Sequence, residues 1–167
     1  MSKRLVTVGL FCGSCLVAGS GWAEPLEVSG VQLSRDLACK GKDLVIAGSG
    51  NQIKVTGPCG AVEIMGANHR VTLEQAKSLV VSGSESEVTI DKVTVLEVGV
   101  DAQRINATLV AGGQPASVLV TGAEGQVRLR LEAPATLNVE GSDQNVTWTG
   151  VEPELQIQGI DNKVVRE

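Results

Sequence analysis

Apolar residues recur at a regular spacing along the chain from Leu44 to the C-terminus. Seven copies of one pattern follow one another at steps of 17 to 22 residues. In every copy the first residue and the residues two and nine places after it are aliphatic, and in six copies a glycine stands four places after the first residue. The copies begin at Leu44, Val62, Leu79, Leu96, Val118, Leu137 and Leu155. Self-similarity at a nearly fixed period indicates a structural repeat.

Within each copy, aliphatic and polar residues alternate both before and after the glycine. This alternation predicts two short strands joined by a tight corner. One copy is too short to bury its own apolar face, so successive copies must stack to form a common core. The sequence therefore predicts an all-β fold, a small parallel β-solenoid of about seven coils, either two-sided or three-sided. A Greek-key sandwich is the alternative, but it would not require glycine and aliphatic residues at the same offsets in every copy.

Glycine and asparagine residues are predicted to form the corner. Glycine reaches the positive φ angles that a tight corner needs, and asparagine tolerates left-handed backbone better than most residues. Stacked asparagine side chains could also form a hydrogen-bonded ladder along the solenoid. The fourth copy departs from the pattern, because Gly99 stands one place early and Val100 occupies the glycine position. The predicted corner residues are Gly48, Asn51, Gly66, Asn68, Gly83, Gly122, Gly141, Asn145, Gly159 and Asn162.

The two ends of the repeat differ from its middle. Residues 24–43 begin like a copy but carry Arg35 where an aliphatic residue is expected, so we interpret them as a degenerate coil that caps the repeats of residues 44–167 within one domain. At the other end, Lys163, Arg166 and Glu167 place charges beside the last strand, a usual protection against edge pairing. The longest step contains an insertion at residues 111–115, either a binding loop or a tolerated surface loop.

The first 23 residues are typical of a secretory signal peptide. Lys3 and Arg4 precede an apolar stretch that is too short for a membrane span, and small residues precede a cleavage site after Ala23. We therefore expect an exported protein, periplasmic or secreted, with no transmembrane span after cleavage. Lipidation of Cys15 is a weaker alternative, because Cys12 stands where lipoprotein signals carry an aliphatic residue.

Charge and aromatic content exclude several kinds of partner. Residues 24–167 contain 12 Lys and Arg residues against 19 Asp and Glu residues, a net charge of −7. This acidic balance argues against nucleic acid, since binding to phosphates needs clustered cations. Trp148 is the only Phe, Tyr or Trp residue of this part, which argues against base-stacking or sugar-stacking surfaces. We expect Trp148 in the core instead.

Two cysteines remain after the predicted cleavage. Cys39 and Cys59 are 20 residues apart, close to the repeat length, so they should lie near one another on adjacent coils. In an exported chain such a pair is most simply a disulfide. A metal site is the competing interpretation, but two thiolates without a nearby histidine make a poor ligand set.

Several motifs together resemble a known family. These are the Gly-Ser-x-Asn-x-Val copies, a Thr-Gly-x-Cys element at residues 56–59, and Asn-Val-Thr-Trp at residues 145–148 followed by Gly-x-x-Asn. They resemble a bacterial family of unknown function, domain of unknown function 3060, over residues 26–167. The resemblance implies an exported, repeat-built protein and supplies no catalytic residues. The second copy departs from the pattern, because Asn68 and His69 stand one place early.

One row of carboxylates is a candidate for chemistry. Four copies carry an acidic residue six places after their start: Glu85, Glu124, Asp143 and Asp161. Stacked carboxylates could bind calcium or act as a pair in glycoside cleavage, or they could form a solvated acidic edge. The Gly-Gly-x-Gly-x-Asp repeat of calcium-binding rolls is absent. The single histidine, His69, has no partner nucleophile in view, and we expect it to be a surface residue without a catalytic role.

The favoured function is non-enzymatic. We expect a binding or envelope-associated structural module whose partner is an unknown protein or glycan of the cell envelope, without a cofactor. The alternative is a carbohydrate-active hydrolytic solenoid that uses the acidic row. The oligomeric state stays open.

Overall fold

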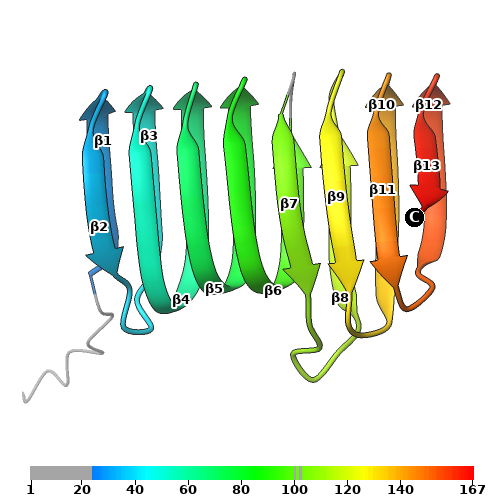
Figure 1. Cartoon of the computed structure of the whole chain (residues 1–167), viewed down its shortest axis with the longest axis horizontal. Coiled ribbons are helices and arrows are strands. Elements are labelled where there is room, and N and C mark those ends of the chain that lie inside the picture. The colour runs from blue at the N-terminus through cyan, green and yellow to red at the C-terminus, as the bar shows by residue number, and fades with distance from the viewer. Residues whose placement is uncertain (1–23, 100, 102) are drawn as a thin grey trace, which may run out of the picture.

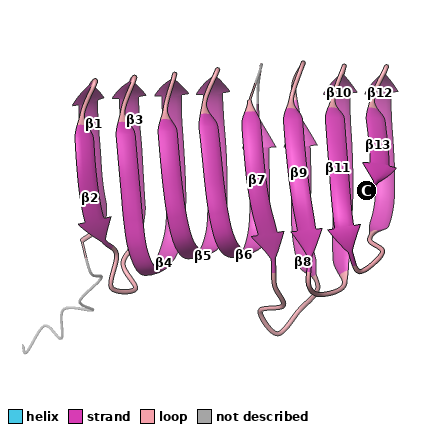
Figure 2. Ribbon diagram, in the orientation of Figure 1, coloured by secondary structure: helices cyan, strands magenta, loops and turns pink. Residues whose placement is uncertain are grey.

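The chain forms a parallel β-solenoid. The computed structural model describes residues 24–99, 101 and 103–167, and all thirteen strands belong to one parallel sheet wound into stacked coils (Figure 1). The described residues contain strands and loops only (Figure 2). The predicted fold class is confirmed. Parallel pairing throughout is incompatible with the Greek-key alternative.

Each coil contributes one stretch to each of two facing sheets. The first sheet contains β1 (Leu26–Val31), β3 (Leu44–Ser49), the later parts of β4 (Gln52–Ala67), β5 (Arg70–Ser84) and β6 (Glu87–Gly99), and then β8 (Ala116–Thr121), β10 (Ala135–Ser142) and β12 (Glu154–Ile160). The second sheet contains β2 (Ser34–Ala38), the early parts of β4 to β6, β7 (Arg104–Leu109), β9 (Gln126–Leu131), β11 (Asn145–Gly150) and β13 (Lys163–Arg166). The solenoid is therefore two-sided.

The two sheets are joined differently at their two margins. A tight corner leads from the first sheet to the second within each coil, and a wide turn leads from the second sheet to the next coil. In β4, β5 and β6 the strand continues through the wide turn without interruption. The inserted loop at residues 111–115 protrudes from the wide turn between β7 and β8, at the lower margin of Figure 1.

The register between coils places like residues on like. Leu44 pairs with Leu26 on one side and with Val62 on the other, and the same frame continues from coil to coil. Between the two terminal coils, the inward aliphatic positions are almost completely buried and form one continuous core. Trp148 lies in this core near its C-terminal end, 5% exposed, as predicted.

The glycine of each tight corner is required by the coil before it. Gly66 has a φ of +118°, and a Cβ atom at this position would overlap the carbonyl oxygen of Gly48. Gly83, Gly141 and Gly159 stand in the same relation to the glycine of the preceding coil. A side chain at these glycines would have to displace the backbone of the coil before it.

Residues 24–43 form a complete first coil. β1 pairs with β3, β2 pairs with β4, and Arg35 lies opposite Ile53, as the repeat frame predicts. The predicted disulfide between Cys39 and Cys59 is confirmed, with Cα atoms 5.1 Å apart, and it joins the wide turns of the first two coils.

Part of the sequence-based interpretation lies outside the described residues. This applies to the signal peptide at residues 1–23, with Cys15, and to Val100. No helix that is long and apolar enough to cross a bilayer occurs in the part of the chain that the structure describes.

Candidate functional site

A row of polar side chains is buried inside the tight corner. It is made by the residue seven places after the start of each copy, here called the inner corner position. In six of the eight coils this residue is Asn, His, Ser or Gln, and five of those six are buried. The residues are Leu33, Asn51, His69, Ser86, Gln103, Gly125, Gln144 and Asn162.

Asparagine at the inner corner position holds two coils together. Asn51 Oδ1 accepts a hydrogen bond from the backbone N–H of Leu33 in the preceding coil at 2.9 Å. Its Nδ2 donates to the carbonyls of Gly30 at 3.1 Å and Ala47 at 3.2 Å. Asn162 makes the three equivalent contacts at 3.0 Å each, two with the coil before it and one with the Gln158 carbonyl of its own coil. The asparagines therefore bond to backbone groups and do not form a side-chain ladder.

His69 occupies the inner corner position and is buried, so the prediction of a surface residue is wrong. The backbone N–H of Asn51 donates to Nδ1 at 3.4 Å, and Nε2 lies 3.0 Å from the carbonyl oxygen of Met65. Both contacts are satisfied when the hydrogen is on Nε2. The imidazole thus makes the two kinds of contact that the Asn51 amide makes, and its role is structural.

Gln103 and Gln144 depart from this arrangement. Both are buried, and neither amide has a hydrogen-bond partner among the described protein atoms. Gly125 lies between them in the row, and a Cβ at this glycine would overlap the Gln144 side chain. Sequence reasoning missed this buried row. The available signal was a polar residue seven places after most starts, which the varied chemistry of the residues concealed.

The predicted acidic row lies one residue before the inner corner position. Glu85, Glu124, Asp143 and Asp161 all have left-handed backbone, with φ between 53° and 57°. Asn68 shares this position and conformation, whereas Asn145 begins β11 and lies outside the corner. Among the described residues, no three His, Cys, Asp or Glu side chains gather closely enough to hold a metal ion.

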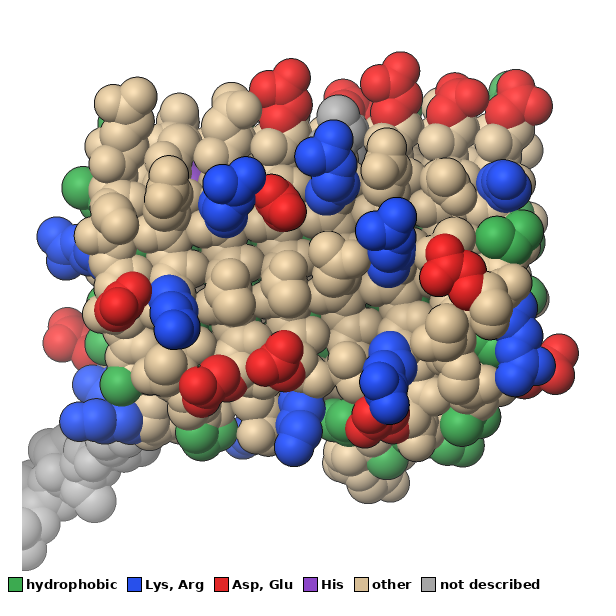
Figure 3. All heavy atoms as spheres, in the orientation of Figure 1, with side chains coloured by type: hydrophobic (Ala, Val, Ile, Leu, Met, Phe, Trp, Pro, Cys, Tyr) green, Lys and Arg blue, Asp and Glu red, His purple; other side chains and the backbone are tan. Residues whose placement is uncertain are grey.

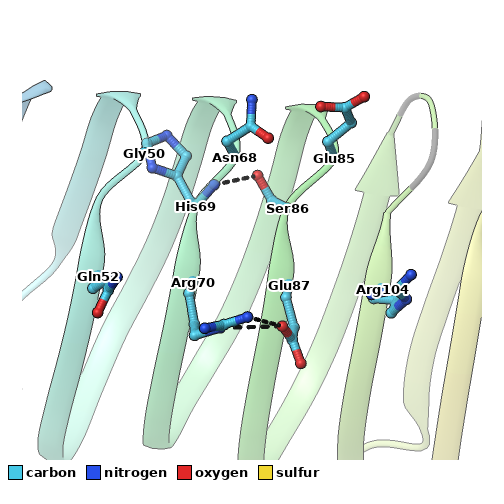
Figure 4. A pocket seen from close by; sticks show the side chains of 9 residues that line it. All are labelled: Gly50, Gln52, Asn68, His69, Arg70, Glu85, Ser86, Glu87 and Arg104. Carbon is cyan, nitrogen blue, oxygen red and sulfur yellow. Dashed lines mark hydrogen bonds and ion pairs between the residues drawn. The ribbon is translucent and has the colours of Figure 1, made fainter. Parts of the chain in front are cut away.

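A polar groove lies beside the tight corner on the second sheet (Figure 4). Its volume is about 540 Å³, and it spans four coils from Gly50 to Arg104. Arg70 and Glu87 form an ion pair across it at 3.0 Å, and Arg104 follows Glu87 in the register. Both members of the pair are solvent-exposed, which makes the pair weak. Because this ion pair is weak, its guanidinium and carboxylate groups could hydrogen-bond a polar ligand instead.

The lining of this groove does not present an exposed nucleophile beside a base. Ser86 is buried, and its hydroxyl already accepts from the N–H of His69 at 3.1 Å and donates to the carbonyl of Ser84 at 3.3 Å. The ring of His69 is occupied by the corner contacts described above. The two groups that could support nucleophilic chemistry here are thus engaged in holding the corner.

The outward surface of the first sheet, here called the acidic face, has an ordered central row. Glutamate and aliphatic residues alternate along it from coil to coil, each opposite the next in the strand register: Glu27, Val45, Glu63, Val80, Glu97 and Leu119. The glutamates are exposed and the aliphatic residues half-buried. Adjacent coils are about 4.8 Å apart, so neighbouring carboxylates lie about 9.6 Å apart. Met65 and Val95 add exposed apolar surface on either side of the row.

The two faces of the solenoid differ in charge. No Lys or Arg occurs on the acidic face or in the tight corners among the described residues, whereas ten carboxylates do. These carboxylates are Glu27, Glu63, Glu97, Glu140 and Glu154 on the face, and Glu85, Asp101, Glu124, Asp143 and Asp161 at the corners. The opposite surface, here called the mixed face, carries charges of both signs. Figure 3 shows the mixed face, with carboxylates along its upper, tight-corner margin.

The middle of the chain contains regular copies of the repeat, with their tight corners, and most of the residues that line the groove. Residues 46–100 match the family described as Protein of unknown function (DUF3060). This finding confirms the resemblance for that segment. The DUF3060 segment runs from β3 to the end of β6 and includes every groove residue except Arg104. It also includes Glu63, Val80 and Glu97 of the acidic face. No curated protein and no solved structure matches the chain.

Proposed function

We propose that the protein is an exported, non-enzymatic binding module that docks a cationic protein surface on its acidic face. The observation that carries this proposal is the alternation of exposed glutamates with aliphatic residues along a flat face without Lys or Arg. A scaffold whose only role is to stack needs no aliphatic side chains on its outer surface. Apolar area rimmed by charge of one sign is typical of a protein interaction site.

Electrostatics specifies the kind of partner. The acidic face presents a one-signed field, which attracts cations and increases the rate of encounter. The aliphatic residues between the carboxylates supply apolar contact once the partner is seated. A partner surface with Lys or Arg residues separated by apolar side chains matches both properties. The disulfide between Cys39 and Cys59 supports export, because such bonds persist in oxidising compartments.

A three-bait capture from the envelope extract tests the proposal. The baits are the wild-type protein, Glu63→Lys/Glu97→Lys on the acidic face, and Asp91→Lys/Glu132→Lys outside it. Both variants change the net charge equally, and all four residues are exposed. We expect a basic partner that wild type and the control retain and the acidic-face variant loses. The purified partner should then bind more weakly as salt is raised. Equal retention by all three baits contradicts the proposal.

The hydrolytic alternative depends on other residues and makes the opposite prediction. Asp143→Asn/Asp161→Asn should abolish turnover in an enzyme that uses the tight-corner carboxylates. In a docking module this variant leaves binding to the acidic face unchanged, because neither residue lies on that face. Partner binding by this variant and by wild type distinguishes the two functions.

A further inference from the structure

The stack of coils has an open edge at each end. β1 and β2 each pair with only one strand, and so do β12 and β13, within the described part of the chain. Each terminal coil therefore presents backbone N–H and C=O groups without a strand partner. Such an edge can pair with a further strand.

The C-terminal edge also exposes core positions. Leu155 and Ile157 are 42% and 49% exposed, whereas their counterparts in the preceding coil, Leu137 and Val139, are completely buried. These residues continue the inward aliphatic columns of the solenoid. Within the described part of the chain, no further coil covers them, whereas β12 covers their counterparts.

The N-terminal edge carries the residues that would cover this surface. Extending the repeat frame by one step beyond β12 places Leu26 on Leu155 and Val28 on Ile157, which is the like-on-like register found within the chain. It also places a glycine on Gly159. That glycine is Gly30, which has φ +153° and has no coil before it among the described residues.

The residue after the corner glycine is large and apolar only in the two end coils. In the interior coils this position carries small or charged residues and no large apolar one: Ser49, Ala67, Ser84, Asp101, Ala123 and Ser142. In the first and last coils it carries Val31 and Ile160, which are 67% and 70% exposed and are the two most exposed large apolar residues described. The same extension of the frame places these two side chains next to one another.

We propose that copies of this protein associate head to tail, with β12 of one copy pairing in parallel with β1 of the next. The contact continues the coil-to-coil interface already present within each copy. Charge supports the same register on the second sheet, because Lys163 would lie diagonal to Asp36 of the next copy. The interface is heterologous and does not close on itself, so it generates linear stacks.

Two arginines limit the strength of this contact. Arg35 and Arg166 both occupy inward positions of the second sheet at opposite ends of the chain. Arg166 lies over the Trp148 ring at 5.0 Å. Association would bring the two guanidinium groups near one another, which opposes tight binding. The stacks are therefore reversible, and salt that screens this repulsion strengthens them.

Analytical ultracentrifugation of the purified protein, from micromolar to millimolar concentration, tests the proposal. The weight-average mass of wild type should rise with concentration. Ile160→Lys and Val31→Lys should each remain monomeric, because each blocks one end. Thr72→Lys adds the same charge to an exposed position of the second sheet away from the edges and should associate like wild type. Arg35→Val, which restores the aliphatic column, should strengthen association at least tenfold.

Mixing the two blocked variants supplies the decisive control. Ile160→Lys keeps an intact N-terminal edge and Val31→Lys keeps an intact C-terminal edge, so their mixture should form a one-to-one dimer that cannot grow. This dimer also shows that both variants are folded. A wild-type protein that stays monomeric throughout overturns the proposal. Association of Val31→Lys by itself also overturns it, because that result indicates symmetric contact between C-terminal edges.

Discussion

At the scale of single residues, different types of side chain accept the same hydrogen bond at the inner corner position. At the tight corner, the backbone N–H of the residue at this position bonds to a side chain of the next coil and not to a backbone carbonyl. Asn51, His69, Ser86 and Asn162 each accept a hydrogen bond from the N–H at the same position of the preceding coil. An unpaired buried N–H would destabilise the fold by about 1–3 kcal/mol. The identity of the side chain varies because geometry requires only an acceptor at that point.

This equivalence gives a prediction for His69. His69→Asn should keep the free energy of unfolding within about 1 kcal/mol of wild type, because the amide supplies the same acceptor and donor. His69→Ala should lower it by roughly 2–3 kcal/mol, because the N–H of Asn51 loses its acceptor and a cavity forms. Urea denaturation of the three proteins measures the difference. Equal losses in both variants would show that the imidazole has a role that the amide does not reproduce.

At the scale of the structural element, the tight corner depends on its glycines through two separate effects. Positive φ disfavours any side chain, and contact with the preceding coil excludes even a methyl group. Gly66 is subject to both effects. Gly41, in the wide turn of the first coil, has φ +80°, but a Cβ atom added there would meet no other atom within 4 Å, so it is subject to the first effect only.

The two glycines therefore form a matched pair. Gly41→Ala should reduce the free energy of unfolding by about 1 kcal/mol, the usual effect of left-handed backbone on an L-residue. Gly66→Ala should reduce it by more than about 3 kcal/mol, because backbone atoms of two coils must move apart. Thermal denaturation followed by circular dichroism compares them. A loss of similar size in both variants contradicts the steric argument.

The disulfide stabilises the first coil by a different mechanism. It closes a loop of 20 residues in the unfolded chain, which corresponds to about 3 kcal/mol of stabilisation in the chain-entropy model. Cys39→Ala/Cys59→Ala should lower the free energy of unfolding by about this amount, plus a smaller contribution from the lost side-chain packing. Denaturation of the variant against wild type, both under non-reducing conditions, measures it. An unchanged stability would indicate that the first coil is not part of the cooperative unit.

The elements also show how far sequence reasoning reaches in this fold. The strands, the glycine column, the disulfide and the burial of Trp148 were predictable, because each follows from the period of the chain. The inner corner row was missed, because the polar residues seven places after the starts differ in type, and only the folded corner shows that they point inward and are buried. The alternation on the acidic face was also missed. It becomes visible only when the register shows which residues of successive coils are neighbours.

At the scale of the whole molecule, each coil contacts only the coils next to it. Stability in such an array is close to a sum over coils and their interfaces, and the terminal coils open most readily. The two ends differ, because a disulfide cross-links the first coil to the second, whereas the last coil has no such cross-link and is held by the continuing chain and by non-covalent contacts.

Amide hydrogen exchange should reproduce this order. We expect the fastest exchange in β12 and β13, slower exchange in β1 and β2, and the slowest in β4 to β6 at the centre of the DUF3060 segment. Mass spectrometry of peptic fragments resolves these regions. Measurements at low concentration keep the copies apart, so the result does not depend on association. Equal protection of the first and last coils contradicts the asymmetry.

The bridge between Cys39 and Cys59 gives the protein a direction under mechanical load. When the two ends of the chain are pulled apart, the last coil separates first and the others follow in order towards the N-terminus. Each coil that is drawn out adds roughly 60 Å of contour length, at about 3.4 Å per residue. The residues inside the covalent loop add none of this length until the bridge is reduced. Under tension the molecule is therefore an extensible tether whose greatest length depends on the redox state of one bond.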